Sequence, residues 1–342
     1  MNDIFLPNIK LQRRYSLALT RYCEGGCDYC CQVIKEKSCK DTEDELLSVL
    51  NKLQIFIENI KKSYEKLNKY YELSCSLMGG ELTDAPQWFQ DKLIPLIQEL
   101  SNYMKIVFFT RGGRVKDNKL IRCINELSKE GKASFVIHLV HWMNHPYAYW
   151  IRYYNNYIEK GAYTFTIVMR PEELPEMVQW GNAIKNSSDN VPLFVNQQIT
   201  PDGISTELYT IFSNIIQKTQ PLGCGENIHD VPFELRKRLC HYISQHGGGT
   251  VNTIDVTCDI DYLCCGQPRG ELLPKRFLNH TPEDRLNPEL HTFDSDFSIE
   301  ICKNCKNMNH ITILGDLKYQ EKSVDRLLDT FLGIESTDWK NN

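Results

Sequence analysis

The stretch that decides the fold is residues 21–30, Arg-Tyr-Cys-Glu-Gly-Gly-Cys-Asp-Tyr-Cys. It follows an apolar run, residues 15–20, which is typical of a buried strand. The cysteines therefore lie in a loop at the carboxyl end of that strand. Gly25 and Gly26 let this loop turn tightly enough for three thiolates to meet at one metal centre. Three thiolates are one fewer than a closed iron–sulfur or zinc site takes, so one metal position stays open for chemistry. A zinc site or three unrelated thiols is the alternative.

Length, charge and cysteine content limit the kinds of protein that this chain can be. The 342 residues can form one large α/β domain or a domain with an appendage. With a net charge of −5, no electrostatic footprint for nucleic acid dominates the whole chain, and a local basic patch is left open as an alternative. We find no apolar run of about 18 residues that would span a membrane, and no signal-peptide pattern at the start, so we expect a cytoplasmic protein. Fourteen cysteines in that compartment predict metal or redox chemistry, because disulfides are rare there.

Strand and helix patterns alternate over the first two thirds of the chain. We expect strands at 15–20, 71–78, 105–110, 133–140, 163–169 and 191–199. We expect helices at 41–67, 86–102, 117–129, 146–160, 172–185 and 206–218, the first with Asp41 as its N-cap. This alternation predicts an α/β fold with a parallel sheet and its helices outside. Ligand sites of such sheets lie at the carboxyl ends of the strands.

The ends of the second, third and fourth strands carry further candidate residues. Met78-Gly79-Gly80-Glu81 ends the second strand; its glycines allow backbone carbonyls to approach a ligand, and its carboxylate can accept from an ammonium group. A plain strand-to-helix turn is the alternative. Thr110-Arg111 ends the third strand, and His138, His141 and Trp142 follow the fourth. The histidines line a substrate pocket or are ordinary buried neutral side chains.

The cysteine loop, with Tyr29 directly before its last cysteine, resembles the signature loop of the radical S-adenosylmethionine (radical SAM) superfamily. The resemblance implies that Cys23, Cys27 and Cys30 bind a [4Fe–4S] cluster. In that family the open iron chelates the amino and carboxylate groups of SAM. An electron from the cluster then cleaves SAM to a 5'-deoxyadenosyl radical, which abstracts hydrogen from the substrate.

The motifs after the second and third strands extend this resemblance. Residues 78–81 resemble the family's Gly-Gly-Glu motif, with Leu82 where proline is common, and residues 110–112 resemble its Thr-Asn-Gly turn, with arginine for asparagine. Arg111 either meets SAM or faces water. The SAM contacts implied by the resemblance are Tyr29, Met78, Gly79, Gly80, Glu81, Thr110 and Arg111.

The resemblance also implies a domain organisation. Residues 1–218 would form a partial (β/α)6 TIM-like barrel. Residues 219–342 would form a small cysteine-rich extension of the SPASM/twitch kind, with a hairpin at 251–256 and 262–265. An auxiliary iron–sulfur cluster is implied there, with a structural zinc ion as the alternative. Its implied ligands are Cys258, Cys265, Cys302 and Cys305, with Cys240 and Cys264 competing with Cys258 for the fourth place.

The resulting expectation is a radical SAM enzyme, an oxidoreductase or radical-based modifying enzyme. We expect a peptide or small-molecule substrate and an electron donor of the flavodoxin or ferredoxin type. A nucleoside- or nucleic-acid-modifying enzyme of the same superfamily is one alternative. A zinc-stabilised scaffold protein without catalysis is the other. No residue stands out in the sequence as a catalytic base or radical quencher.

Overall fold

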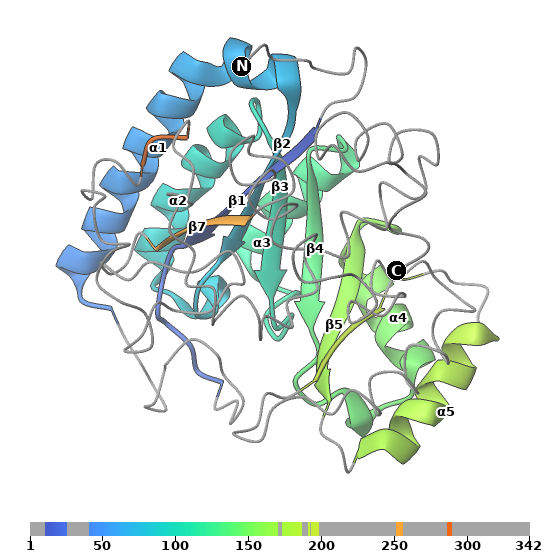
Figure 1. Ribbon diagram of the computed structural model, residues 1–342. Coiled ribbons are helices and arrows are strands. Elements are labelled where there is room, and N and C mark those ends of the chain that lie inside the picture. The colour runs from blue at the N-terminus through green and yellow to red at the C-terminus, as the bar shows by residue number, and fades with distance from the viewer. Residues whose placement is uncertain are drawn as a thin grey trace, which may run out of the picture.

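A computed structural model describes residues 11–25, 41–169, 173–186, 191, 193–197, 251–255 and 286–288. Within them the chain forms a sheet of seven strands in the order β6-β5-β4-β3-β2-β1-β7 (Figure 1). The strands are β1 (Leu11–Ala18), β2 (Tyr71–Met78), β3 (Lys105–Thr110), β4 (Ala133–His138), β5 (Tyr163–Met169), β6 (Leu193–Gln197) and β7 (Val251–Asp255). All neighbouring strands pair in parallel. The predicted parallel α/β sheet is therefore confirmed.

The connections between β1 and β6 step across the sheet in one direction. They carry the helices α1 (Glu43–Tyr70), α2 (Gln87–Leu100), α3 (Lys119–Lys129), α4 (Tyr147–Asn155) and α5 (Leu174–Lys185), and the short 3-10 helices η1 (Leu82–Asp84) and η2 (Trp142–Asn144). Crossovers between parallel strands are right-handed almost without exception. Helices that step the same way therefore pack on the same face. Consistent with this, α1 packs against α2, and α2 against α3 (Figure 1).

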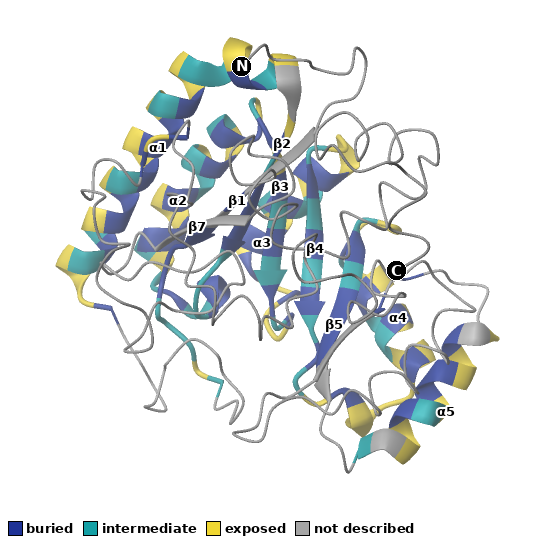
Figure 2. Cartoon of the chain, viewed as in Figure 1, coloured by how far each residue is buried: buried dark blue, intermediate teal, exposed yellow. Residues whose placement is uncertain are grey.

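The two faces of the sheet differ in burial because side chains alternate along each strand. One face carries the apolar core beneath the helices (Figure 2). A continuous row crosses five strands there, and its members are exposed by no more than 1%: Leu17, Leu77, Phe108, Phe135 and Tyr163. On the opposite face, half-buried residues recur at every second position of β3 and β4. The apolar core of the described residues thus lies on one side of the sheet, and side chains on the other side are half-buried.

Late segments of the chain return to the first strand and helix. β7 pairs in parallel with β1, from Arg14 opposite Val251 to Ala18 opposite Asp255. The strand predicted at 251–256 is thus confirmed. We expected it to pair with a second hairpin strand, and among the described residues it pairs with β1. The predicted second hairpin strand at 262–265 and the predicted helix at 206–218 lie outside the described residues.

Residues 286–288 pack against the same part of the sheet. The Tyr15 hydroxyl donates to the carbonyl oxygen of Pro288 over 2.8 Å. The Asn59 side-chain amide on α1 donates to the carbonyl oxygen of Leu286 over 3.1 Å, and the Leu286 side chain is buried. Residues far apart in sequence therefore stabilise the β1–α1 unit that leads into the cysteine loop. Among the described helices, none is long and apolar enough to cross a membrane.

Candidate functional site

The described part of the cysteine loop, residues 19–25, continues from the carboxyl end of β1. Cys23 is half-buried there, and its Sγ lies 3.7 Å from the carbonyl oxygen of Gly25. Burial raises the pKa of the Cys23 thiol, while the Gly25 carbonyl contact and the positive charge of Arg111 act in the opposite direction. The other predicted loop ligands and contact, Cys27, Tyr29 and Cys30, lie outside the described residues.

The Gly-Gly-Glu segment lies against the cysteine loop, backbone to backbone. The amide of Gly80 donates to the carbonyl oxygen of Thr20, and the amide of Glu81 donates to that of Tyr22, each over 2.5 Å. A β-carbon on Gly79 would collide with the Thr20 carbonyl oxygen, and one on Gly80 with the Tyr22 carbonyl oxygen. Both glycines are therefore required for the close approach of these two loops. The two motifs lie about 50 residues apart in the sequence, where they are separate signals, and the structure brings them together.

The carboxylate of Glu81 joins the end of β2 to the end of β3. It is buried, and its Oε1 accepts from the Thr83 amide at 3.2 Å, from the Thr83 hydroxyl at 2.7 Å and from the Thr110 hydroxyl at 2.9 Å. Its Oε2 accepts from the Arg111 amide at 2.5 Å. Donors of the chain itself therefore hold both oxygens. The expectation that this carboxylate accepts from a ligand ammonium group stays a prediction; in the structure the carboxylate joins the two turns.

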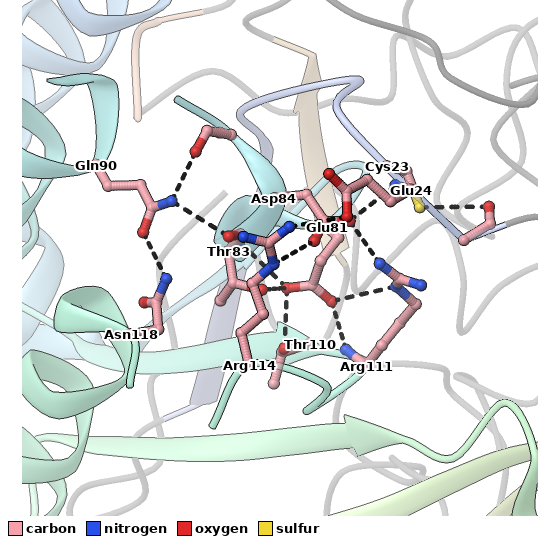
Figure 3. Close-up of polar contacts among 12 residues, drawn as sticks. Cys23, Glu24, Glu81, Thr83, Asp84, Gln90, Thr110, Arg111, Arg114 and Asn118 are labelled. Atoms are coloured by element: carbon pink, nitrogen blue, oxygen red, sulfur yellow. Dashed lines mark hydrogen bonds and ion pairs between the residues drawn. The ribbon is translucent and has the colours of Figure 1, made fainter. Parts of the chain in front are cut away.

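Asp84 connects the same turn to the cysteine loop (Figure 3). Its Oδ2 accepts from the backbone amide of Glu24 at 2.8 Å and from Nη2 of Arg111 at 2.5 Å. Its Oδ1 lies 3.1 Å from Nε of Arg114, whose Nη2 lies 2.8 Å from the Glu24 carboxylate. The guanidinium of Arg111 also fills the space that a side chain at Gly25 would need. Sequence reasoning missed Asp84, Arg114 and Glu24, because nothing in the local pattern marks a charge that pairs across loops.

Asp41 anchors the start of the cysteine loop from the other side. Its carboxylate accepts from the Thr20 hydroxyl at 2.6 Å, from the Arg21 amide at 2.8 Å and from Arg21 Nε at 2.7 Å. Arg21 also pairs with Glu45, and the hydrogen bond to Asp41 is the largest of the causes that raise the pKa of Arg21. Asp41, just before α1, and Glu45 within it therefore hold the start of the loop where it leaves β1.

The prediction that Asp41 caps α1 is wrong by one residue. The hydroxyl of Thr42 accepts from the Glu45 amide at 3.2 Å, and the Glu45 carboxylate accepts from the Thr42 amide at 2.7 Å. This reciprocal pair is a capping box, and the Thr-x-x-Glu spacing at 42–45 signals it in the sequence. Because Thr42 caps the helix, Asp41 is free to hold the cysteine loop.

The residues after β4 have different environments. His138 is half-buried, and burial, aided by the charge of Arg111, lowers its pKa to about 4, so its imidazole is neutral at pH 7. His141 is exposed. Trp142 is buried, and its ring lies 5.0 Å from that of Trp180 in an edge contact. His138 is thus half-buried and neutral, which fits either role expected for it, while Trp142 belongs to the core.

Of the described cysteines, Cys23, Cys75 and Cys123, only Cys23 lies in the cysteine loop. Cys75 is fully buried and burial raises its pKa, so it is the ordinary core thiol expected there. Within the described ranges no three His, Cys, Asp or Glu residues are grouped so as to hold a metal ion. The cysteines proposed for the auxiliary site, Cys240, Cys258, Cys264, Cys265, Cys302 and Cys305, lie outside these ranges.

Comparison with known proteins gives distant structural matches only. No protein-family model and no curated protein sequence matches the chain. One similar structure is SuiB from Streptococcus suis bound to the precursor peptide SuiA, with 14% identity, a TM-score of 0.34, and coverage of 72% of this chain and 49% of that one. Another is coproporphyrinogen III oxidase (HemN) from Escherichia coli, described as a radical SAM enzyme, with 12% identity, a TM-score of 0.30, and coverage of 69% and 53%. The match spans about half the length of each solved chain. Function is therefore argued from the residues of this chain.

Proposed function

We propose that this protein is a radical SAM enzyme in which Cys23, Cys27 and Cys30 bind a [4Fe–4S] cluster. The observation that carries the proposal is the backbone pairing of the cysteine loop with the Gly-Gly-Glu turn, through Gly80 and Glu81. A cluster-binding loop and a SAM-binding turn must lie within reach of one another for SAM to meet the open iron. The half-buried thiol of Cys23 and the glycines beside it fit a thiolate-ligated cluster.

The residues of the chain divide the work of binding between them. When bound, the cluster and SAM together supply the reductive cleavage that yields a 5'-deoxyadenosyl radical. Backbone groups of Met78, Gly79 and Gly80, with Tyr29, would hold the methionyl and adenine parts of SAM. Glu81 and Thr110 hold the two turns together through a buried 2.9 Å hydrogen bond. Their role in this proposal is to keep the SAM-binding backbone in place.

The half-buried face of the sheet supports a substrate position. Phe109, Val136 and His138 lie on that face, at or near the carboxyl ends of β3 and β4. We propose that the sheet curves into the partial (β/α)6 barrel and that a peptide or small molecule binds over this face. The net charge of −5 gives no support to a nucleic-acid substrate.

The rest of the proposal concerns the C-terminal third and the partners. Residues 219–342 would form the cysteine-rich extension, with an auxiliary iron–sulfur cluster or zinc bound by Cys258, Cys265, Cys302 and Cys305. A flavodoxin- or ferredoxin-type protein would donate electrons. The count of 14 cysteines favours a reducing, cytoplasmic setting.

The test is anaerobic reconstitution followed by incubation with reductant and SAM. We expect iron and sulfide bound to the chain, a brown colour with absorbance near about 400 nm, and 5'-deoxyadenosine detected by mass spectrometry. Replacing Cys23, Cys27 and Cys30 together with alanine should abolish that product, while alanine at the buried Cys75 should leave it intact in folded protein. Colourless protein with stoichiometric zinc would instead support the scaffold alternative. Unchanged 5'-deoxyadenosine from the triple variant would refute the assignment of the loop.

A further inference from the structure

Glu24 and Gly25, which follow the first loop cysteine, are in contact with residues from two other loops. Glu24 follows Cys23 directly, and its backbone amide donates to Asp84 Oδ2 at 2.8 Å. Gly25 comes next and packs so closely against the guanidinium of Arg111 that a β-carbon there would have to displace the guanidinium. Arg114 reaches the Glu24 carboxylate at 2.8 Å. Two consecutive residues beside Cys23 therefore take their positions from the turns after β2 and β3 (Figure 3).

The charges in this cluster are arranged around one buried carboxylate. The side chain of Asp84 is 2% exposed and lies between two guanidinium groups, with Arg111 Nη2 at 2.5 Å and Arg114 Nε at 3.1 Å. A buried carboxylate is stable only when charged or polar partners replace its water. Its contact with the Glu24 amide is a charge-assisted hydrogen bond, which is stronger and more directional than a neutral one. The loop is thereby tied to a fixed point of the fold.

From this geometry we infer that Asp84 and Arg111, supported by Arg114, are positioning residues that hold the cysteine loop in its cluster-binding shape. The inference rests on the proposed function and assigns to Arg111 a role other than contact with SAM. Arg111 directs Nη2 to Asp84 and lies with Nε 3.7 Å from the Glu81 carboxylate, so its charge is already engaged by acidic side chains of the chain. Removing Asp84 or Arg111 should therefore loosen the same loop.

The experiment compares Asp84→Asn, Arg111→Gln and the double variant with the wild type. Each protein is reconstituted anaerobically, and the rate of iron transfer to a chelator is followed by the loss of visible absorbance. SAM binding to the loaded fraction is measured by equilibrium dialysis. Lys129→Gln is the control, because its ion pair with Glu126 is exposed and remote from the loop. The melting midpoint of each metal-free protein reports whether it is folded.

We expect each single variant to release iron about tenfold faster than the wild type, the change that loss of one charge-assisted hydrogen bond produces. The double variant should release it no faster than the faster single variant, because both residues act through one contact network. SAM affinity of the loaded fraction should change by less than about threefold, within the spread of a remote effect. Lys129→Gln should behave as the wild type.

One other result would overturn the inference, and another would overturn the proposed function on which it rests. Wild-type iron release in both single variants, with about tenfold weaker SAM binding in Arg111→Gln alone, would make Arg111 a SAM ligand. If the wild-type protein takes up no iron and sulfide, the proposed function itself fails. This result is distinct from failure of the inference, because the inference concerns only differences between the variants and a wild type that binds the cluster. Should Asp84→Asn fail to fold, Arg111→Gln decides by the same criteria. The rate of iron release from Arg111→Lys should then lie between those of Arg111→Gln and the wild type, because lysine keeps the charge but loses the planar fork.

Discussion

The carboxyl edge of the sheet has two halves that are built differently. The charged half comprises the loops after β1, β2 and β3, residues 20–25, 79–84 and 110–114, and is held by backbone contacts, hydrogen bonds and ion pairs. The aromatic half follows β4 and includes α4. Ring contacts hold it, as between Trp142 and Trp180 at 5.0 Å, His145 and Tyr149 at 3.9 Å, and Tyr153 and Tyr154 at 5.1 Å.

The two halves differ in how strictly their contacts fix the positions of atoms. Hydrogen bonds and paired charges depend on the position and angle of single atoms, so the charged half can set the geometry of a bound cofactor. Ring packing depends mainly on buried area and tolerates small shifts. Of the predicted cofactor residues, those that the structure describes lie in the charged half or, for Met78, directly before it. The aromatic half is therefore expected to carry stability, and the charged half to carry the site.

Removing a large buried ring of the aromatic half should have the largest effect on stability. Trp142 is buried, and its carbonyl oxygen accepts from Trp150 Nε1 at 3.0 Å. We expect Trp142→Ala to lower the free energy of unfolding by about 3–5 kcal/mol, because it leaves a large cavity. Urea denaturation measures this. Met143→Ala is the matched control, since the adjacent Met143 side chain is exposed. Equal stability of the two variants would contradict the division proposed between the halves.

The charged half can be tested by adding one methyl group. Gly80→Ala places a β-carbon against the Tyr22 carbonyl oxygen, where the backbone must shift. We expect a loss of up to about 3 kcal/mol, as for an overpacked site, and weaker retention of iron after reconstitution. Gly113→Ala should cost far less, because no atom lies near its β-carbon and its φ is not positive. Denaturation curves and iron content measured together would show whether the contact matters; unchanged values for both would argue against it.

His138 should make stability depend on pH. A histidine in the unfolded chain binds a proton below about pH 6.5, whereas His138 in the folded protein stays neutral until about pH 4. The unfolded state therefore binds more protons between these values, and stability falls as pH falls. The expected contribution to the loss between pH 7 and pH 5 is about 2 kcal/mol. His138→Gln should shrink the difference between urea curves at the two pH values. A difference as large as that of the wild type would exclude His138 as the cause.

The smallest effect is expected at the N-terminus of α1. Thr42→Ala removes the hydroxyl that accepts from the Glu45 amide and should lower stability by about 1 kcal/mol. Thr42→Ser keeps that acceptor and should restore most of the loss. Thermal unfolding of both variants tests the capping box. If alanine and serine behave alike, the cap contributes little, and Asp41 would have to be considered again.

Local sequence patterns were sufficient to predict much of the fold. The spacing of apolar residues predicts the strands, the helices and their alternation. Strict alternation of strands and helices in turn predicts a parallel sheet. The first strand was expected at 15–20 but runs over Leu11–Ala18, because pairing with β2 draws in its polar N-terminal residues. Cysteine and glycine motifs were also visible, since each depends on residues close together in the chain.

Contacts between distant segments were beyond the reach of such patterns. Nothing local shows that Asp84 meets Arg114 and the amide of Glu24, or that β7 pairs with β1. Nor does the motif reveal that Gly79 and Gly80 are needed for the approach of the cysteine loop. These features depend on which loops the folded sheet brings side by side at its carboxyl edge. Composition and spacing predicted which residues are candidates for binding, and the packing of three loops decided how those residues are held.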